Sequence, residues 1–261
     1  MTPVFLHHGL LAPGKIAVGP RTFGSFVGID RVFAERGYTT MLTQVHPTAS
    51  VARRASQLKS IVLEHLKNLD GSSPMRVVIF AHSMGGLDAR YMISKLGMDD
   101  KVAAVVTVST PHRGSPYADW CMRHLTRFKT LQLFNAMGLD VGAAADLTTE
   151  ACGKFNEQTR DVAGVKYYSV SAARPFWSVT PLLYQPYRVV YEAEGENDGL
   201  VSVRSAKWGE HLETWAADHW HLLNRRFVIE LEHATGDIRP YYGRVIERLE
   251  GDGVLERGDR G

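Results

Sequence analysis

Short apolar runs alternate along the chain with longer segments in which apolar residues recur every three or four positions. The runs at 76–81 and 102–108 are almost continuously apolar, as expected of parallel strands that carry helices on both faces. The short runs predict strands at Val4–His7, Thr39–Val45, Met75–Ala81, Val102–Ser109, Lys166–Ala172 and, more weakly, Arg188–Glu192. The alternation predicts an α/β fold with a mainly parallel central sheet and helices on both of its faces.

The longer segments predict amphipathic helices. After Ser50, a residue type suited to cap a helix N-terminus, apolar residues at 51, 55, 58, 62, 66 and 69 form one stripe. A helix is also expected from about Met84, and another over Asp237–Leu249. We therefore expect a single domain over 1–250, followed by a flexible tail of glycine and charged residues over 251–261.

Composition narrows the class of protein. The 261 residues are 44% hydrophobic and 22% charged, which is typical of a globular protein and excludes a disordered or coiled-coil chain. Thirty Lys and Arg against 28 Asp and Glu give a net charge of +2, so we expect no nucleic-acid partner. No apolar run approaches the roughly 18 residues of a membrane span. No signal peptide precedes the first strand, so we expect an intracellular protein; a secreted protein whose export segment was removed is the alternative.

The sequence Ala81-His82-Ser83-Met84-Gly85 carries the strongest chemical signal. An apolar strand runs into a tight turn and a helix starts at once, which is the arrangement of a nucleophile elbow. The serine hydroxyl then stands above the carboxyl edge of the sheet, and the helix N-terminus favours the negative charge that develops during attack. Ala81 replaces the first glycine of the usual Gly-x-Ser-x-Gly pattern but adds only one methyl group. A plain strand-end turn is the alternative, yet the flanking strand and helix favour Ser83 as a nucleophile.

A serine nucleophile needs a base, which in this arrangement comes last in the chain, after the acid. His219 lies after the last predicted strand, where the base belongs. His221 is two residues further on, and the chemistry of the residues alone does not separate the two.

The acid is expected between the serine and the base. Asp198 lies in an Asn-Asp-Gly turn after the predicted strand 188–192, and 21 residues before His219. Asp88 would point away on the helix after the serine, and Asp218 is too close in sequence to reach the Nδ1 atom of His219. An Asn-Asp-Gly turn without a catalytic role is the alternative, but its place in the chain favours Asp198 as the acid.

An oxyanion hole requires two backbone N–H donors. The amide of Met84, directly after the nucleophile, is one expected donor. The second is expected in a loop after an early strand, and Leu10 follows the first strand in the sequence His8-Gly9-Leu10. His-Gly is also common at strand ends, so it is the presence of the elbow that favours Leu10.

Taken together, these stretches resemble the α/β-hydrolase triacylglycerol lipases of the Pseudomonas and Burkholderia type and their fungal intracellular relatives. The matching stretches run in the family's order and are His8-Gly9-Leu10, His82-Ser83-Met84-Gly85-Gly86-Leu87 with Ala89-Arg90-Tyr91, Ser109-Thr110-Pro111-His112-Arg113-Gly114-Ser115, Leu147-Thr148-Thr149 with Phe155-Asn156, Asn197-Asp198-Gly199-Leu200-Val201-Ser202, and Asp218-His219. The resemblance implies an α/β-hydrolase fold and a triad of Ser83, Asp198 and His219. It also implies an oxyanion hole at Leu10 and Met84, and it selects the first of the two histidines as the base.

Two departures from the family concern its metal and its disulfide. Bacterial members carry a structural calcium with an aspartate ligand two residues after the catalytic histidine, a position held here by His221. A further aspartate ligand precedes the acid in the family, yet 173–191 contains no acidic residue. Since calcium requires oxygen ligands, we expect no calcium site, and the reaction requires no cofactor. Arg204 stands where some relatives have a disulfide cysteine, and we expect Cys121 and Cys152 to be free thiols, as in a protein that stays inside the cell.

The segment 116–147 lacks strand patterning and predicts a helical lid or cap inserted in the domain. In the related lipases this insertion is a mobile lid whose apolar face turns towards lipid at an interface. A cap helix packed permanently on the core is an equal alternative. The residues expected to contact the acyl chain are Phe128, Leu131, Phe176, Trp177 and Leu182. For the last three, ordinary core packing is the alternative.

The sequence therefore predicts a serine carboxylic-ester hydrolase of lipase type that cleaves acylglycerols or other fatty-acyl esters through an acyl-enzyme on Ser83. His219 would act first as base and then as acid, and Asp198 would fix its tautomer. The expected partners are a lipid or ester substrate and, transiently, a lipid interface. An esterase for short-chain or polymeric esters, or an acyltransferase with the same triad, is the alternative. A non-catalytic binding protein of the same fold is less favoured because the Ser-Asp-His order is intact.

Overall fold

The structure is a computed structural model that describes residues 1–10, 15–18, 21–69, 75–127, 142–225 and 236–257. Parallel strands form one six-stranded sheet in the order β4-β1-β5-β6-β7-β8. These strands are β1 (Val4–His7), β4 (Thr40–Leu42), β5 (Val77–His82), β6 (Val102–Val108), β7 (Lys166–Ala172) and β8 (Glu210–Trp215). A separate antiparallel pair is formed by β2 (Lys15–Val18) and β3 (Arg21–Gly24).

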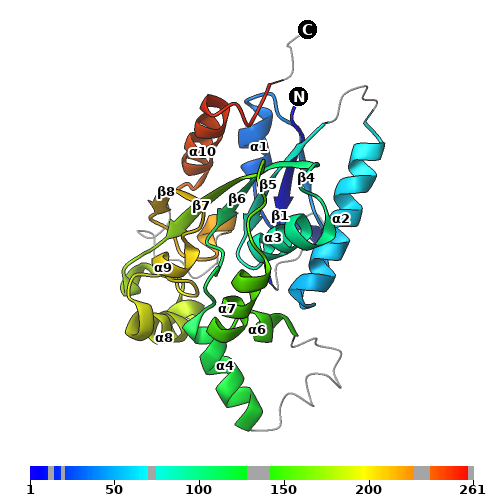
Figure 1. Ribbon diagram of the computed structural model, residues 1–261. Coiled ribbons are helices and arrows are strands. Elements are labelled where there is room, and N and C mark those ends of the chain that lie inside the picture. The colour runs from blue at the N-terminus through cyan, green and yellow to red at the C-terminus, as the bar shows by residue number, and fades with distance from the viewer. Residues whose placement is uncertain (11–14, 19–20, 70–74, 128–141, 226–235, 258–261) are drawn as a thin grey trace.

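Helices cover both faces of the sheet (Figure 1). They are α1 (Ile29–Ala34) and α10 (Arg239–Gly251) on one face, and α2 (Val51–Lys67) and α3 (Gly85–Leu96) on the other. Successive residues of a strand point to opposite faces, so neighbouring residues contribute to separate cores. Leu6 and Phe80 pack in the core shared with α1 and α10, whereas Phe5 and Ile79 pack in the core shared with α2 and α3.

A second group of helices lies beyond the carboxyl ends of the strands (Figure 1). These are α4 (Pro116–Arg127), α6 (Gly142–Asp146), α7 (Thr149–Gln158), α8 (Tyr184–Glu194) and α9 (Val203–Ala206), with short 3-10 turns at Phe176–Ser178, Pro181–Leu183 and His221–Leu223. The carboxylate of Asp119 on α4 accepts from the amide and the hydroxyl of Thr149, at 2.9 and 2.8 Å. That contact fastens α4 to the start of α7, so these helices form one layer over the sheet edge.

The predicted strands agree with the observed sheet except at one position. β1 and β7 begin and end where the sequence predicts, and β4, β5 and β6 differ only at their ends. The weak strand predicted at 188–192 is wrong, because this segment lies inside α8. Its buried residues, Pro186, Tyr187 and Val190, follow helical spacing, while Arg188 lies on the exposed side.

Two features at the end of the chain were not predicted. β8 is an edge strand in which only Trp215 is buried, so its sequence lacks the apolar run that marks the inner strands. Val254 and Leu255 are 7% and 3% exposed and pack in the same core as α10. The packed chain therefore continues past the domain boundary expected at residue 250, and the last tail residues, 258–261, lie outside the described residues. None of the described helices combines the length and the apolar composition that crossing a membrane requires.

Candidate active site

Ser83 lies on the sharp turn between β5 and α3. Its φ of 56° is in the left-handed region, which costs a non-glycine residue about 1–2 kcal/mol. Its amide donates to the carbonyl of Val108 at 2.9 Å, and the hydroxyl of Thr110 donates to its carbonyl at 2.7 Å. A Cβ atom on Gly9 would lie only 2.6 Å from Ser83 Cβ, so glycine lets the loop at 8–10 pass directly beside the serine. The turn is thus held from two sides.

Three side chains from distant parts of the chain form one hydrogen-bonded row. His219, in the loop after β8, lies with its Nε2 atom 3.0 Å from Ser83 Oγ and its Nδ1 atom 2.6 Å from Asp198 Oδ2. Ser83 is 8% exposed, Asp198 is fully buried and His219 is 4% exposed. When Nδ1–H donates to the carboxylate, Nε2 is left as the acceptor for the serine proton. The structure therefore brings together the three side chains that the sequence predicts as nucleophile, acid and base.

The carboxylate of Asp198 is held by four donors. Its Oδ1 atom accepts from the amides of Leu200 and Val201, at 2.9 and 2.8 Å. Its Oδ2 atom accepts from the hydroxyl of Ser109 at 2.6 Å as well as from His219. Sequence reasoning misses Ser109, although its place directly after β6 puts it at the same edge of the sheet. Asp198 itself follows helix α8, not the strand that was predicted before it.

His221, the rival candidate for the base, lies in a different cluster. Its Nδ1 atom is 3.0 Å from Asp218 Oδ2, and the same carboxylate accepts from the amide and the hydroxyl of Thr180, each at 2.8 Å. Burial, the largest single influence, raises the pKa of Asp218, but hydrogen bonds and charge from His221, together with the amides of His221 and Thr180, lower that pKa to about 2. The cluster therefore fastens the loop around residue 180 to the loop that carries His219.

The Asp218 cluster occupies the sequence position of the family's calcium site, but it does not fit a calcium ion. Asp218 Oδ2 already accepts from Thr180 and His221, and its Oδ1 atom accepts from the amides of Trp220 and His221, each at 3.0 Å. The carboxylate is thus committed to protein donors, whereas calcium requires free oxygen ligands. Within the described ranges, no group of three or more His, Cys, Asp or Glu side chains could hold a metal ion.

The side chain of His82 contacts the loop that carries His219. Its ring lies 4.6 Å from that of His219, and its Nε2–H donates to the His219 carbonyl at 3.0 Å. Burial, together with the charge of His219, lowers the pKa of His82 well below 6.5. His82 is therefore a neutral donor to the backbone, and its position directly before the serine is the sequence signal that could have indicated this contact.

The loop at 8–10, which carries the candidate oxyanion donor Leu10, rests on a buried ion pair. The guanidinium of Arg54 donates to the carbonyl of His8 at 2.7 Å and to Asp88 Oδ2 at 2.8 Å, and Arg54 and Asp88 are fully buried. The same carboxylate oxygen is 3.0 Å from His7 Nε2. Burial, opposed by Asp88, lowers the pKa of His7. Since Asp88 belongs to α3, this network ties the loop at 8–10 to the helix that begins beside the serine.

The side chains next to the two candidate oxyanion donors form a small apolar cluster with the helices above the sheet. Met84 is fully buried and packs with Val51, Leu87, Ala143 and Cys152, and Leu10 packs against this cluster. Ala143 belongs to α6 and Cys152 to α7, so both helices contact this cluster directly.

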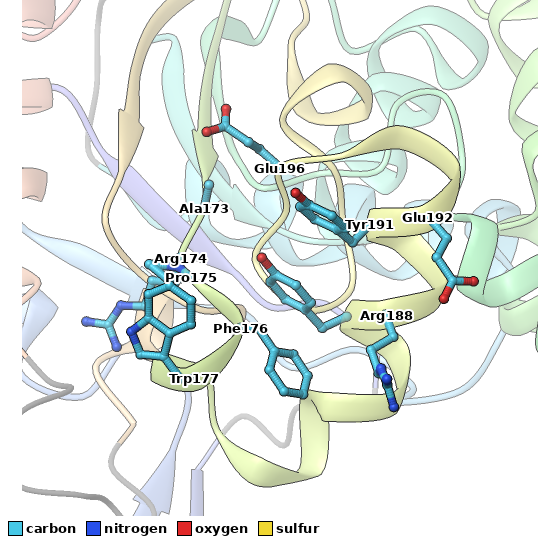
Figure 2. A pocket seen from close by; sticks show the side chains of 10 residues that line it. Ala173, Arg174, Pro175, Phe176, Trp177, Arg188, Tyr191, Glu192 and Glu196 are labelled. Atoms are coloured by element: carbon cyan, nitrogen blue, oxygen red, sulfur yellow. The ribbon is translucent and has the colours of Figure 1, made fainter.

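The expected acyl-chain residues are only partly described. Phe128 and Leu131 lie outside the described residues. Trp177 and Leu182 are 75% and 69% exposed, so core packing does not account for them. Figure 2 shows Phe176 and Trp177 on a turn that faces α8. This turn and residues of α8 line a hollow of about 540 Å³. The lining of this hollow does not include Ser83, Asp198 or His219.

Both cysteines are free thiols, as expected. Cys152 is fully buried, and burial is the main cause that raises its pKa to about 12. A thiol with so high a pKa is not a nucleophile at neutral pH. Ser83 therefore has no competing nucleophile in Cys152.

Comparisons with known proteins bear on the fold and on the relatives of this chain. A family described as "PGAP1-like alpha/beta domain" matches residues 41–143. Triacylglycerol lipase 2 of Saccharomyces cerevisiae is 31% identical over 76% of this chain, and a triacylglycerol lipase of Burkholderia plantarii is 31% identical over 45% of it. The chain spans 62% of the yeast relative's length and 32% of the Burkholderia relative's length.

Solved structures share the whole fold at lower identity. A metagenomic carboxyl esterase superposes with a TM-score of 0.78 at 22% identity, covering 96% of this chain and 76% of the esterase. The lipase of Staphylococcus hyicus superposes with a TM-score of 0.73 at 16% identity, covering 97% of both chains. The parallel sheet, the flanking helices and these likenesses define the fold as that of the α/β hydrolases. Within that class, the curated proteins that this chain resembles in sequence are triacylglycerol lipases.

Proposed function

We propose that the protein is a serine carboxylic-ester hydrolase of lipase type. The observation that carries the proposal is the hydrogen-bonded row Ser83–His219–Asp198, with distances of 3.0 and 2.6 Å between its polar atoms. An imidazole between a serine hydroxyl and a buried carboxylate is the arrangement that activates serine for acyl transfer. The naming of the yeast relative as a triacylglycerol lipase supports the same reaction class.

The proposed reaction proceeds through an acyl-enzyme. His219 Nε2 takes the proton of Ser83 as Oγ attacks the ester carbonyl carbon, and the amides of Leu10 and Met84 donate to the oxyanion. Protonated His219 then gives its proton to the departing alkoxide, which leaves as the alcohol. Water attacks the acyl-enzyme with His219 again as base, and the acid leaves as Ser83 regains its proton. Asp198 holds the Nδ1–H tautomer and stabilises the imidazolium throughout.

The proposed substrate is a fatty-acyl ester. Phe176, Trp177 and Leu182 would contact the acyl chain, as would Phe128 and Leu131, which lie outside the described residues. Support comes from the exposure of Trp177 and Leu182. Such large apolar side chains at the surface also suit transient contact with a lipid interface, where an amphipathic tryptophan ring is favoured.

The proposed organisation is one α/β domain with a cap inserted over 116–147. The amide of Val51, at the start of α2, donates to Asp146 Oδ2 at 2.8 Å, and Ala143 is buried against the core. These contacts favour a fixed attachment for the C-terminal end of the cap. We also propose an intracellular location, which the free thiols Cys121 and Cys152 support.

A fluorescent alkyl phosphonate tests the reaction class. It should label the wild-type protein covalently and fail to label Ser83→Ala, because the phosphonate forms its bond to an activated serine oxygen. Failure of the wild type to label, or equal labelling of Ser83→Ala, would refute a catalytic role. The buried Cys152→Ala variant is a control for adventitious labelling and should react like the wild type.

A panel of p-nitrophenyl esters with acyl chains of increasing length tests the substrate class. The lipase proposal expects turnover of long-chain esters and of emulsified triacylglycerol, all abolished by Ser83→Ala. Activity confined to the shortest esters would assign the protein to the carboxylesterases instead. Transfer of the acyl group to an added alcohol in preference to water would identify an acyltransferase.

A further inference from the structure

Ser109 occupies a strained position at the carboxyl end of β6. It is fully buried, and its φ of 48° lies in the left-handed region that serine rarely adopts. Such a conformation is unfavourable for a residue other than glycine and persists only where the surrounding structure holds it. Its amide donates to the carbonyl of Val170 at 2.8 Å, so the backbone at Ser109 is fixed by the neighbouring strand.

This conformation brings the Ser109 hydroxyl to the acid of the hydrogen-bonded row. The hydroxyl donates to Asp198 Oδ2 at 2.6 Å, and the same oxygen accepts from His219 Nδ1 at 2.6 Å. The other oxygen is already held by two backbone amides. The carboxylate therefore keeps its orientation without Ser109, and the hydroxyl competes with the imidazole for the charge on one oxygen atom.

We propose that Ser109 is a positioning residue that acts through Asp198 to weaken the hold of the carboxylate on the proton of His219, which keeps the base neutral at lower pH. The inference rests on the proposed function, because it assigns Ser109 a part in the same reaction. A carboxylate that loses one charge-assisted donor carries more negative charge towards its remaining partner. Without the hydroxyl, imidazolium is stabilised more, so a larger fraction of His219 is protonated and unable to act as base.

The other charged and titratable groups next to His219, or next to its neighbour His82, are the same in the wild type and in variants of Ser109. His82 from β5 and His8 from the loop at 8–10 are kept neutral by burial, which lowers the pKa of His82 well below 6.5 and that of His8 to about 3. Arg225, after the 3-10 turn that follows His219, lowers the pKa of His82 further through its charge. Asp218 is directed to Thr180 and His221. All of these contacts are shared by the wild type and by variants of Ser109.

The test separates the hydroxyl from the strained backbone. Ser109→Ala and Ser109→Gly both remove the hydroxyl, but only glycine relieves the positive φ. The acidic limb of the kcat/KM profile should move to higher pH in both variants, by about half a pH unit to one unit, because the hydroxyl acts on His219 only indirectly, through the shared oxygen of Asp198. Stability to urea should instead depend on the backbone, with Ser109→Gly more stable than Ser109→Ala. Ser109→Thr keeps the hydroxyl and should retain the wild-type limb.

Thr107→Val is the matched control. Thr107 is a buried residue of β6 whose hydroxyl donates to the Tyr168 carbonyl at 3.1 Å, away from Asp198. Its loss should lower stability and leave the acidic limb in place. Limbs of Ser109→Ala and Ser109→Gly that coincide with that of the wild type would overturn the proposal.

A measurement without turnover distinguishes this failure from failure of the proposed function. The imidazole resonances of His219, assigned with His219→Gln, can be titrated by NMR in the wild type and in Ser109→Gly. A shift of this titration to higher pH in a protein that hydrolyses no ester would refute the proposed function and leave the role of Ser109 standing. Ester turnover together with an unshifted titration of His219 would support the proposed function and refute the role of Ser109.

Discussion

The hydroxyl of Thr110 donates a 2.7 Å hydrogen bond to the backbone carbonyl of Ser83, the residue whose φ is 56°. Thr110 is fully buried and packs closely against α3, since a Cβ atom on Gly86 would lie 2.2 Å from its Oγ1 atom. The strained turn is therefore enclosed between the loop after β6 and the first turn of α3. Glycine at position 86 is required by this close approach.

Replacing Thr110 with valine should weaken this turn. The side chain keeps its shape, but the buried Ser83 carbonyl loses its hydroxyl donor and keeps only the Gly86 amide, at 3.1 Å, so we expect a loss of about 1 kcal/mol of folding free energy. Because the position of Ser83 Oγ depends on the turn, we expect kcat to fall at least about tenfold with a smaller change in KM. Urea unfolding and ester kinetics measure the two effects. Thr107→Val should lower stability without lowering kcat. A kcat of Thr110→Val within twofold of the wild type would contradict the prediction, because the turn would then keep its geometry without the Thr110 hydroxyl.

The ion pair between Arg54 and Asp88, next to the loop at 8–10, supports a second prediction. Asp88→Ala would leave the fully buried Arg54 guanidinium without its charge partner, at a cost of about 3–5 kcal/mol. Since Arg54 also fixes the His8 carbonyl, we expect the loop to loosen and kcat to fall more than KM rises. The matched control is Glu213→Ala, which breaks the partly exposed pair with Arg244 and should change stability by less than about 1 kcal/mol. Equal effects of the two variants would contradict the prediction.

Much of the sheet could be predicted because its inner strands are buried on both faces. β5 and β6 appear in the sequence as continuous apolar runs because helices cover both of their faces, and the structure buries nearly all of their residues. β8 has no such run because it lies at the edge, where only Trp215 is buried. The segment 188–192 was wrongly predicted as a strand because a short, largely apolar run fits a strand and a buried helix segment equally well.

The hydrogen-bonded row could be predicted because an elbow motif and the order Ser-Asp-His are readable along the chain. Its supporting contacts could not. Ser109 and Asp198 are 89 residues apart, and their contact depends on β6 lying beside β5 and β7 in the sheet. Arg54 reads in the sequence as a charged residue of an amphipathic helix, and only the position of α2 against the loop at 8–10 gives it a partner.

Buried histidines predict how stability depends on pH. Burial is the main cause that lowers the pKa of His8 to about 3 and that of His82 and His112 well below 6.5. These groups are neutral when folded, whereas the unfolded chain binds protons near pH 6.5, so stability is fully present above that pH and is lost as the pH falls. Each histidine contributes up to about 1.4 kcal/mol per pH unit.

The midpoint of urea unfolding should therefore fall steeply between pH 7 and pH 5 at constant salt. His112→Phe keeps a ring stacked on Trp208 and removes one of the titrating groups, so its midpoint should depend less on pH than that of the wild type. A midpoint that stays constant from pH 7 to pH 5 would contradict the assignment of these histidines as neutral.

Chelation provides the last prediction. Asp218 joins the loop around residue 180 to the loop that carries His219 through its contacts with Thr180 and His221. Since its carboxylate is already committed to protein donors, EDTA should leave kcat and the melting temperature unchanged, and added calcium should raise neither. Asp218→Asn should instead lower the melting temperature by several degrees, because Asn cannot accept charge-assisted hydrogen bonds at both positions. Loss of activity in EDTA that calcium restores would show that the chain keeps a metal site after all.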